Sequence, residues 1–173
     1  PCLCPCSCVA GSTELALESD MTTFKGVAEG SHVYNPMDSS DVHQVDRTFH
    51  SEYLDSNVTE LTFGNGKTLV SSGNHPFMSP NETVVTADEL KVGDEILNGS
   101  LTRVSVEGKR KIKMPEDGMF NVIVSQDSKR AMDHLLVSNG VVSGDWLLQA
   151  QNDSVDVGVM IRLGEVKTYN QSL

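Results

Sequence analysis

Basic charge is scarce in this sequence, long apolar runs are missing, and aromatic residues make up only 5% of it. Of its 173 residues, 13 are lysine or arginine and 24 are aspartate or glutamate, which gives a net charge of −11. Nucleic acids and anionic membranes bind basic surfaces, so we expect neither as the main partner. No apolar run approaches the length that spans a membrane. Glycine and proline occur in ordinary numbers, 14 and 6, and the length suits one globular domain.

Evidence about cellular location is indirect. No segment has the pattern of a signal peptide, and we expect the chain to be an excised fragment. The motif Asn-x-Ser/Thr occurs more often than composition alone explains, which predicts a secretory or extracellular location. Chance in a chain rich in serine and threonine is the alternative. The motif stands at Asn57, Asn81, Asn98, Asn152 and Asn170.

All four cysteines stand at the start of the chain, and none follows Cys8. Neighbours in sequence cannot tie distant loops together, so the pattern does not fit a disulfide-stabilised mini-protein. We favour the interpretation that the segment before Cys8 is the cysteine-rich tail of an upstream protein that ends at Ser7. A strained Cys6–Cys8 disulfide that masks Cys8 is one alternative. Another is a soft-metal cluster for Cu(I) or Zn, built from Cys2, Cys4 and Cys6.

Short β-rich runs separated by turn residues follow one another along the chain. The clearest hairpin joins "NVTELTF" (57–63) to "KTLVSS" (67–72) through the glycine turn "GNG". The one basic run, "GKRKIK" (108–113), lacks interleaved aromatic residues and is interpreted as a solvated strand or loop. Only "TADELKVGD" (86–94) indicates a helical turn. This rhythm predicts an all-β domain of many short strands.

Three segments contain residue types that can carry chemistry. Cys8 opens the apolar run "CVAGSTELAL", and Ser72 and His75 lie at a strand end in "SSGNHPFM" (71–78). The third segment, "HLLVSNGVVSGDW" (134–146), has an Asn-Gly turn between two apolar runs. Taken singly, such features are usually structural: a small buried thiol, a turn histidine and an ordinary hairpin.

Taken in order, and together with "ADELKVGDEIL" (87–97), these segments resemble the Hint family, which comprises the autoprocessing domains of hedgehog proteins and inteins. Members begin with a nucleophilic cysteine, carry a Thr-x-x-His box at a hairpin end and close with a strand pair of the "NGVV" type. The resemblance implies a compact, all-β Hint fold with long curved paired strands. It divides the chain into an upstream tail (1–7), an autoprocessing domain (8–148) and a C-terminal extension (149–173), in which "DVGVMIRL" is expected to add a strand.

The resemblance also implies a single-turnover reaction at the Ser7–Cys8 peptide bond. The Cys8 thiol attacks the carbonyl carbon of Ser7, and the resulting thioester is resolved by water, a thiol or a sterol-like alcohol. His75 is the candidate acid for the departing amine because a histidine pKa can lie near neutrality, and Ser72 is the candidate hydroxyl that holds the scissile amide. Asp46 is the candidate base for the second step, with a solvated strand carboxylate as the alternative. The substrate is thus the upstream polypeptide of the same chain.

Two branches of the family differ at positions that can be compared here. Inteins close the domain with His-Asn, and the Asn cyclises; this chain has Gly144-Asp145, and an aspartate lacks the carboxamide nucleophile. Hedgehog-type domains carry Asp-Arg ahead of the His box, as Asp46-Arg47 does here. Ser72 stands where the family usually has threonine, which keeps the hydroxyl and loses the stiffening methyl. We therefore expect the hedgehog-like branch, without splicing.

Metals and cofactors are not expected in the catalytic domain. His43 and His50 flank Asp46, but no further ligand follows at a fixed spacing, and His134 is interpreted as structural. We expect a monomer. Alternatives from other classes are a catalytically silent β-domain that acts as a binding module or spacer, a cysteine-cluster metal module, and an intein-like splicing or C-terminal cleavage domain.

Overall fold

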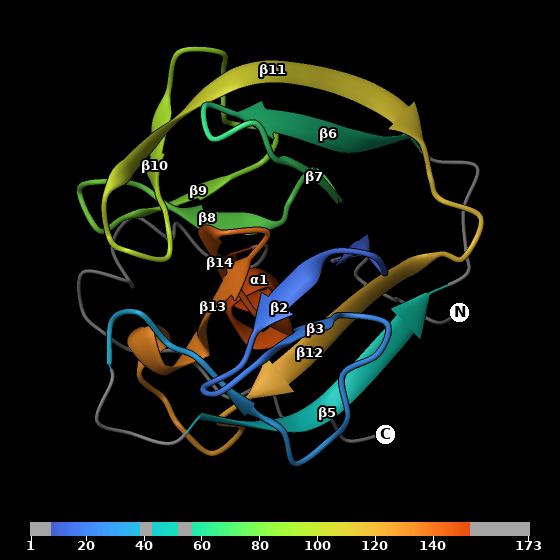
Figure 1. The fold of residues 1–173 in the computed structure, drawn as a ribbon, viewed down its shortest axis with the longest axis vertical. Coiled ribbons are helices and arrows are strands. Elements are labelled where there is room, and N and C mark those ends of the chain that lie inside the picture. The colour runs from blue at the N-terminus through green and yellow to red at the C-terminus, as the bar shows by residue number, and fades with distance from the viewer. Residues whose placement is uncertain (1–7, 39–42, 52–56, 153–173) are drawn as a thin grey trace.

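The computed structural model describes residues 8–38, 43–51 and 57–152, and nearly all of its regular structure is antiparallel strand. The larger sheet has eight strands in the order β10-β11-β6-β7-β1-β12-β5-β4. Their bounds are β1 (Val9–Ala10), β4 (His32–Val33), β5 (His43–Ser51), β6 (Asn57–Phe63), β7 (Thr68–Ser71), β10 (Glu95–Leu97), β11 (Arg103–Lys113) and β12 (Met119–Val124). Because β6 and β11 lie at the top of Figure 1 and β5 and β12 at the bottom, this one sheet runs through both halves of the molecule.

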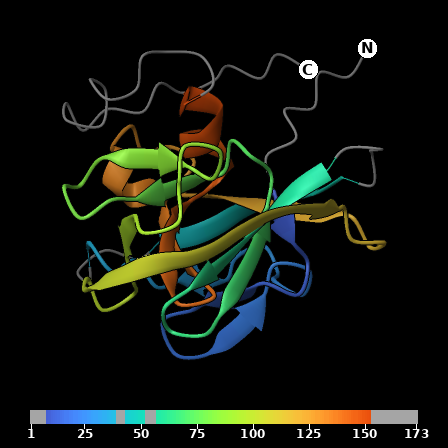
Figure 2. The ribbon, with the colours of Figure 1, turned by 90° about the horizontal axis from the view of Figure 1, so that it is seen from above.

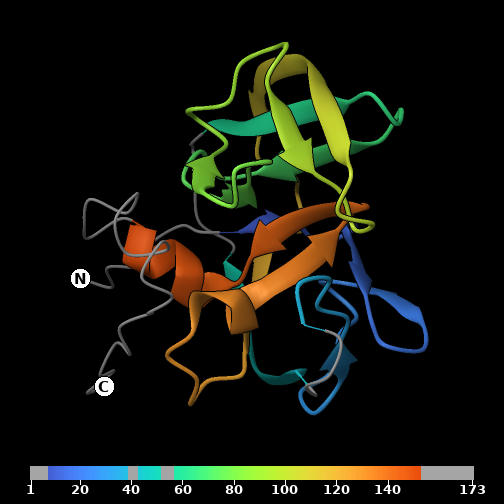
Figure 3. The same cartoon turned by 90° about the vertical axis from the view of Figure 1, so that its left-hand side faces the viewer.

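The smaller sheet has six strands in the order β3-β2-β13-β14-β8-β9. Their bounds are β2 (Glu14–Ala16), β3 (Met21–Thr23), β8 (Pro76–Met78), β9 (Val84–Thr86), β13 (Leu135–Ser138) and β14 (Val141–Gly144). The 3-10 helix η1 (Ala131–His134) precedes the β13–β14 hairpin, and the helix α1 (Trp146–Asn152) follows it. In Figure 3 this hairpin and α1 lie below the strands from β6 to β11. The predicted all-β class is confirmed.

Both predicted hairpins are present, and their turns explain where they form. The β6–β7 turn contains Gly66 at a φ of 81°, a conformation that glycine adopts at little cost. The β13–β14 turn places Asn139 at a φ of 47° and Gly140 at 82°, the two positive values of a type I′ turn. Ser143 of β14 then pairs with Phe77 of β8, so this hairpin brings the end of the described chain to the segment around residue 76.

The pair β6–β11 is the longest and carries the predicted basic run. Its register runs from Val106 opposite Phe63 to Lys113 opposite Asn57, with a shift after Val106 that marks a β-bulge. A bulge bends its strand, and Figure 2 shows β11 as a long strand that curves across the molecule. Residues 108–113 lie in β11 and are partly or fully exposed, as a solvated strand requires.

Two main apolar clusters hold the elements together. The larger one lies between the sheets and contains Phe63 and Phe77, whose rings meet edge to face with centroids 6.4 Å apart. The second attaches α1 to the strands: Trp146 is buried and stacks on Phe49 of β5 at 5.5 Å. Burying aromatic and aliphatic side chains in this way is the main stabilising contribution to such a fold.

The segments outside the predicted strands differ in how they fold. The turn predicted at 86–94 is present, and Thr86 and Glu89 close it reciprocally: the Thr86 amide donates to Glu89 Oε2 (2.8 Å) and the Glu89 amide to Thr86 Oγ1 (3.4 Å). The boundary predicted after residue 148 falls inside α1. The predicted tail, 1–7, and the strand predicted at 156–163 lie outside the described residues. No helix in the described ranges has the length and apolarity that crossing a membrane requires.

Candidate active site around Cys8

Cys8 stands immediately before β1, which lies between β7 and β12 in the larger sheet. Pairing of Val9 with Ser71 and Phe120 fixes the backbone on both sides. The Cys8 amide donates a hydrogen bond to Ser72 Oγ (3.1 Å), and the Ser72 amide donates to the Cys8 carbonyl (2.9 Å). The thiol is buried. The fold therefore brings Ser72 to the amide nitrogen of the predicted scissile bond; Ser7, on the other side of that bond, lies outside the described residues.

The turn from Ser72 to His75 lies against the loop that contains Asp88. A Cβ added at Gly73 would meet the carboxylate of Asp88, an exposed side chain that would have to turn away to admit a larger residue. The Asp88 amide also donates to the Gly73 carbonyl at 2.7 Å, and the His75 amide donates to the Ser72 carbonyl at 3.2 Å. This close approach of two loops fixes where the imidazole of His75 lies.

His75 is fully buried, and the burial changes its acid–base behaviour. Loss of hydration lowers the pKa of the imidazole to about 4, although a hydrogen bond from Nδ1 to Gln149 Oε1 (3.3 Å) opposes the shift. Nε2 has no hydrogen-bond partner among the described residues. The sequence-based expectation of a pKa near neutrality is therefore not met: at pH 7 His75 is neutral, with a proton on Nδ1 and a lone pair on Nε2.

Gln149, on the buried face of α1, connects the other polar groups of the site and was not among the predicted residues. Its Nε2 donates to Asn74 Oδ1 (2.6 Å) and to Ser72 Oγ (3.4 Å), while its Oε1 accepts from His75. A continuous set of hydrogen bonds thus leads from the imidazole of His75 through Gln149 and Ser72 to the Cys8 amide. Since Gln149 is fully buried, its position depends on how α1 is held.

Asp145 holds the start of α1 and is itself held by His134. Its Oδ1 accepts from the Leu148 amide (2.9 Å), which caps the helix. Its Oδ2 accepts from the Val124 amide (3.0 Å) and from His134 Nδ1 (2.9 Å). Burial alone would lower the pKa of His134, but the charge and hydrogen bond of Asp145 and the Ser128 carbonyl on Nε2 outweigh it, and the pKa rises to about 9. Both ring nitrogens face acceptors, so His134 is an imidazolium at pH 7.

The fold has counterparts among known protein structures. No protein-family profile matches the chain, and no curated protein sequence does. Among solved structures, an intein-like domain from Clostridium thermocellum matches with a TM-score of 0.66 and 22% identity, over 80% of this chain and 98% of that one. The gp41-1 intein matches at 0.65 and 16% over 80% and 98%, and the MchDnaB-1 intein at 0.62 and 20% over 79% and 99%. This chain has the Hint fold of inteins.

The intein fold confirms the predicted fold but not the predicted branch. The structures named above are all inteins or intein-like, and they give no support to the hedgehog-like assignment. The branch was inferred in part from Asp46, whose carboxylate accepts from the Gln126 amide (2.6 Å). Strand β12 separates β5 from β1, and the register places His50 of β5 in line with Val9 through Phe120, so Asp46 lies two strands away and four residues, about 13 Å, further along β5. The structure does not bring Asp46 to Cys8.

The family resemblance implies a His-Asn pair at the end of the domain, and this chain has Gly144 and Asp145 there, with different side-chain contacts. Asp145 replaces the Asn and is used as a helix cap. At Gly144, an added Cβ would lie 2.5 Å from Leu148 Cδ2 and 2.8 Å from Pro76 Cγ. There is no room for a histidine at this position unless α1 moves.

The remaining predicted residues lie apart from Cys8 or outside the described ranges. His43 and His50 do not converge on Asp46: His43 Nδ1 contacts Ser125 Oγ (3.1 Å), and His50 Nε2 contacts the Asp117 carbonyl (2.8 Å). The proposed cluster of Cys2, Cys4 and Cys6 lies outside the described residues. Of the predicted glycosylation motifs, Asn57 and Asn81 are exposed, and the secretory location stays a prediction.

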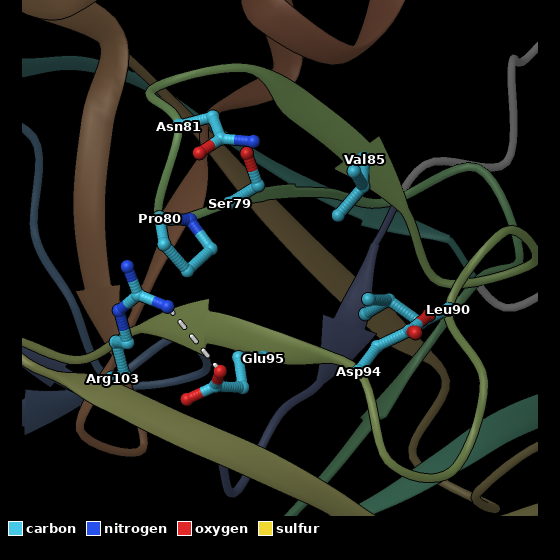
Figure 4. A pocket seen from close by; sticks show the side chains of 8 residues that line it. All are labelled: Ser79, Pro80, Asn81, Val85, Leu90, Asp94, Glu95 and Arg103. Atoms are coloured by element: carbon cyan, nitrogen blue, oxygen red, sulfur yellow. Dashed lines mark hydrogen bonds and ion pairs between the residues drawn. The ribbon is translucent and has the colours of Figure 1, made fainter.

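A surface pocket of about 310 Å³ lies on the half of the molecule formed by β8 to β11. In Figure 4 Arg103 and Glu95 lie next to each other on one side of the pocket, with Nη1 and Oε1 3.4 Å apart. Its walls contain none of the residues that contact Cys8, so it is separate from the candidate active site. It is lined by Ser79, Pro80, Asn81, Val85, Leu90, Asp94, Glu95 and Arg103.

Proposed function

We propose that this chain is a self-processing domain that cleaves the peptide bond between Ser7 and Cys8 through a thioester. One arrangement carries the proposal: the nitrogen that would leave, Cys8 N, is hydrogen-bonded to Ser72 Oγ, and Gln149 connects that hydroxyl to the buried imidazole of His75. A thiol, a hydroxyl on the scissile nitrogen and an imidazole are the groups that an N-to-S acyl shift uses. The intein fold supports the same class of reaction.

In the first step, the Cys8 sulfur bonds to the carbonyl carbon of Ser7, and the bond from that carbon to Cys8 N breaks. The thiol proton moves to the departing amine, so the step is an isomerisation and needs no co-reactant. We assign the proton transfer to His75. With a pKa of about 4 it is neutral at pH 7 and has a lone pair on Nε2 to accept the proton, and the imidazolium formed is a strong acid toward the amine.

Ser72 and Gln149 act as positioning residues. The hydrogen bond from the Cys8 amide to Ser72 Oγ holds the nitrogen in place while its conjugation with the Ser7 carbonyl is lost. Gln149 Oε1 keeps the His75 proton on Nδ1, which leaves Nε2 as the basic atom. Removing either contact is expected to slow the reaction without removing a reacting group.

The thioester is resolved by a nucleophile from outside, which we propose to be water or a small thiol. An alcohol such as a sterol needs a base to attack a thioester, and the Asp46 carboxylate is bound to the Gln126 amide at a distance from Cys8. We further propose that no bond is cleaved after Asp145. Its side chain has no carboxamide to cyclise, and its oxygens are occupied by Leu148, Val124 and His134.

The test is the rate of thiol-induced release of an upstream partner protein fused before Pro1. Cys8→Ala should abolish release, and His75→Ala should slow it by about 10²–10⁴. Ser72→Ala should cost about 0.5–1.5 kcal/mol of activation free energy, which is a slowing of about 2- to 10-fold.

Gln149→Ala is paired with Gln44→Ala, which removes an exposed glutamine of β5 away from the site. Slowing in the first variant and the parent rate in the second would support the positioning role. Release at the parent rate from folded His75→Ala protein would remove His75 from the mechanism. Release from Cys8→Ala protein would show that cleavage does not pass through a thioester on Cys8.

A further inference from the structure

Three acidic and imidazole side chains meet at a place that the proposed reaction does not use. Asp38, His43 and Asp133 each bring one potential ligand atom to within 4.8 Å of the others. They come from separate parts of the chain: the segment before β5, the first residue of β5 and the helix η1. In the lower half of Figure 1 these parts lie on the side of the molecule away from β6 and β11.

Two atoms of this cluster are buried without a hydrogen-bond partner among the described residues: His43 Nε2 and Asp133 Oδ1. His43 is 2% exposed and Asp133 is 7% exposed. A buried polar atom without a partner is costly, and in native proteins it usually indicates a missing water or ion. The only other such atom in the described ranges is His75 Nε2, in the candidate active site.

The second polar atom of each buried ligand is already occupied, as is usual for metal ligands. Ser125 Oγ lies 3.1 Å from His43 Nδ1. Because Nε2 has no acceptor, the imidazole proton belongs on Nδ1, and the Nε2 lone pair is available. Asp133 Oδ2 accepts from Ser128 Oγ, which leaves Oδ1 as the available carboxylate oxygen.

The Arg130 side chain lies beside the cluster. The Arg130 guanidinium lies 3.8 Å from Asp38 Oδ2 through Nη2 and 3.8 Å from Asp133 Oδ1 through Nη1. These are ion-pair distances rather than hydrogen bonds. The Arg130 side chain is 60% exposed, so it is able to leave the carboxylates when another cation binds them.

We propose that Asp38, His43 and Asp133 bind a divalent transition-metal ion of the zinc class. One imidazole with two carboxylates favours such an ion over Ca²⁺ or Mg²⁺, which take oxygen ligands alone. Donors in a tetrahedral zinc site lie about 3.4 Å apart, given bonds of about 2.0–2.1 Å. The three residues therefore close slightly on binding, and Asp38, the most exposed of them, moves most. The ion would clamp η1 to the start of β5. This inference is independent of the proposed self-cleavage.

The test is titration of the full chain with Zn²⁺ by calorimetry, in a form with all four cysteines changed to serine. Cobalt(II) serves as a second probe, because its visible spectrum reports nitrogen and oxygen ligation without sulfur. We expect one equivalent of metal to bind, the melting temperature to rise with metal, and a Co²⁺ spectrum of a four- or five-coordinate site. Failure of the chain to bind one equivalent would overturn the proposal.

Variants locate the site. Binding of the one equivalent of metal should be abolished by each of Asp133→Asn, His43→Gln and Asp38→Asn. It should persist in Asp127→Asn, which changes an exposed carboxylate in the turn before η1. Asp38→Asn keeps the test valid if the two buried variants fail to fold.

Two residues that contact the proposed ligands provide further variants. Ser125→Ala should weaken binding by about 10- to 100-fold, because Ser125 orients His43. Arg130→Gln should strengthen binding, since it removes the competing cation. Binding that is unchanged by Asp38→Asn and weakened by Arg130→Gln would place the metal elsewhere and contradict the assignment.

Discussion

The ion pair between His134 and Asp145 gives the sharpest stability prediction. Asp145→Asn keeps the size of the side chain and removes the charge that makes His134 an imidazolium. The Asn oxygen can still accept from one of the two backbone amides, but the Asn NH2 group faces the other donor, so the change removes the charge and one acceptor together. We expect a large loss of stability at pH 7 that becomes smaller as the pH rises.

The magnitude follows from the pKa of His134, which rises from 6.5 to about 9 in the folded chain. The folded state keeps its proton up to about pH 9, while the unfolded chain loses it near 6.5. The stabilisation is therefore complete below pH 6.5 and is lost as the pH rises through 9. This linkage gives about 2.5 kcal/mol at pH 7 and about 0.4 kcal/mol at pH 9. The buried amide left without an acceptor adds about 1–2 kcal/mol, so the total at pH 7 is about 3.5–4.5 kcal/mol, within the 3–5 kcal/mol for breaking a buried pair.

The assay is urea unfolding between pH 7 and 9 in a Cys8→Ala background, which cannot process itself. Asp20→Asn is the control, because Asp20 is an exposed carboxylate bonded only locally, to the Met21 amide. Between pH 7 and pH 9, the free energy of unfolding of the parent and of the control should fall by about 2 kcal/mol. That of Asp145→Asn should fall much less. His75 stays neutral in the folded chain throughout and changes the free energy of unfolding by only about 0.2 kcal/mol over this range. An Asp145→Asn protein with the slope of the parent would refute the assignment of the proton to His134.

Three further predictions concern the reaction and the packing around it. Thioester formation, measured at trap concentrations that no longer raise the rate, should not fall between pH 7 and 5.5, because the pKa of His75 is about 4; an acid limb centred near 6.5 would contradict this. Gly144→Ala should lower the melting temperature, since its Cβ would lie 2.5 Å from Leu148 Cδ2, with a cost of about 1–3 kcal/mol; an unchanged melting curve argues against the tight contact. Asp46→Ala should leave thiol-induced release at the parent rate, and a loss comparable to that of His75→Ala would restore Asp46 to the reaction.

The parts of the fold that were predicted are those with local signals. The hairpin at 57–72 and the Asn139-Gly140 turn are visible because turn residues and alternating apolar residues stand next to one another. Ser72 lies at the Cys8 amide as the family resemblance implied. In each case the residues that decide the structure are close in sequence or belong to a known motif.

The parts that were missed depend on contacts between distant residues. Gln149 meets His75 and Ser72 across 74 and 77 positions, and nothing local marks it. Helix α1 is capped by Asp145, the residue before it, whose charge is balanced by His134 in another element. Asp46 was placed near Cys8 by resemblance, but the β5–β12 register shifts at this residue, and its carboxylate meets Gln126 instead.

The most direct measurement is the intact mass of every species formed when the chain, fused to a folded partner at each end, is incubated with hydroxylamine. Hydroxylamine captures the acyl group of a thioester. We predict two products: an upstream piece that ends in the hydroxamate of Ser7, and a second piece that begins with Cys8 and keeps the C-terminal partner. A ligated product of the two partners, or a fragment released after Asp145, would contradict cleavage limited to the Ser7–Cys8 bond. No cleavage of the folded parent protein would contradict the thioester itself.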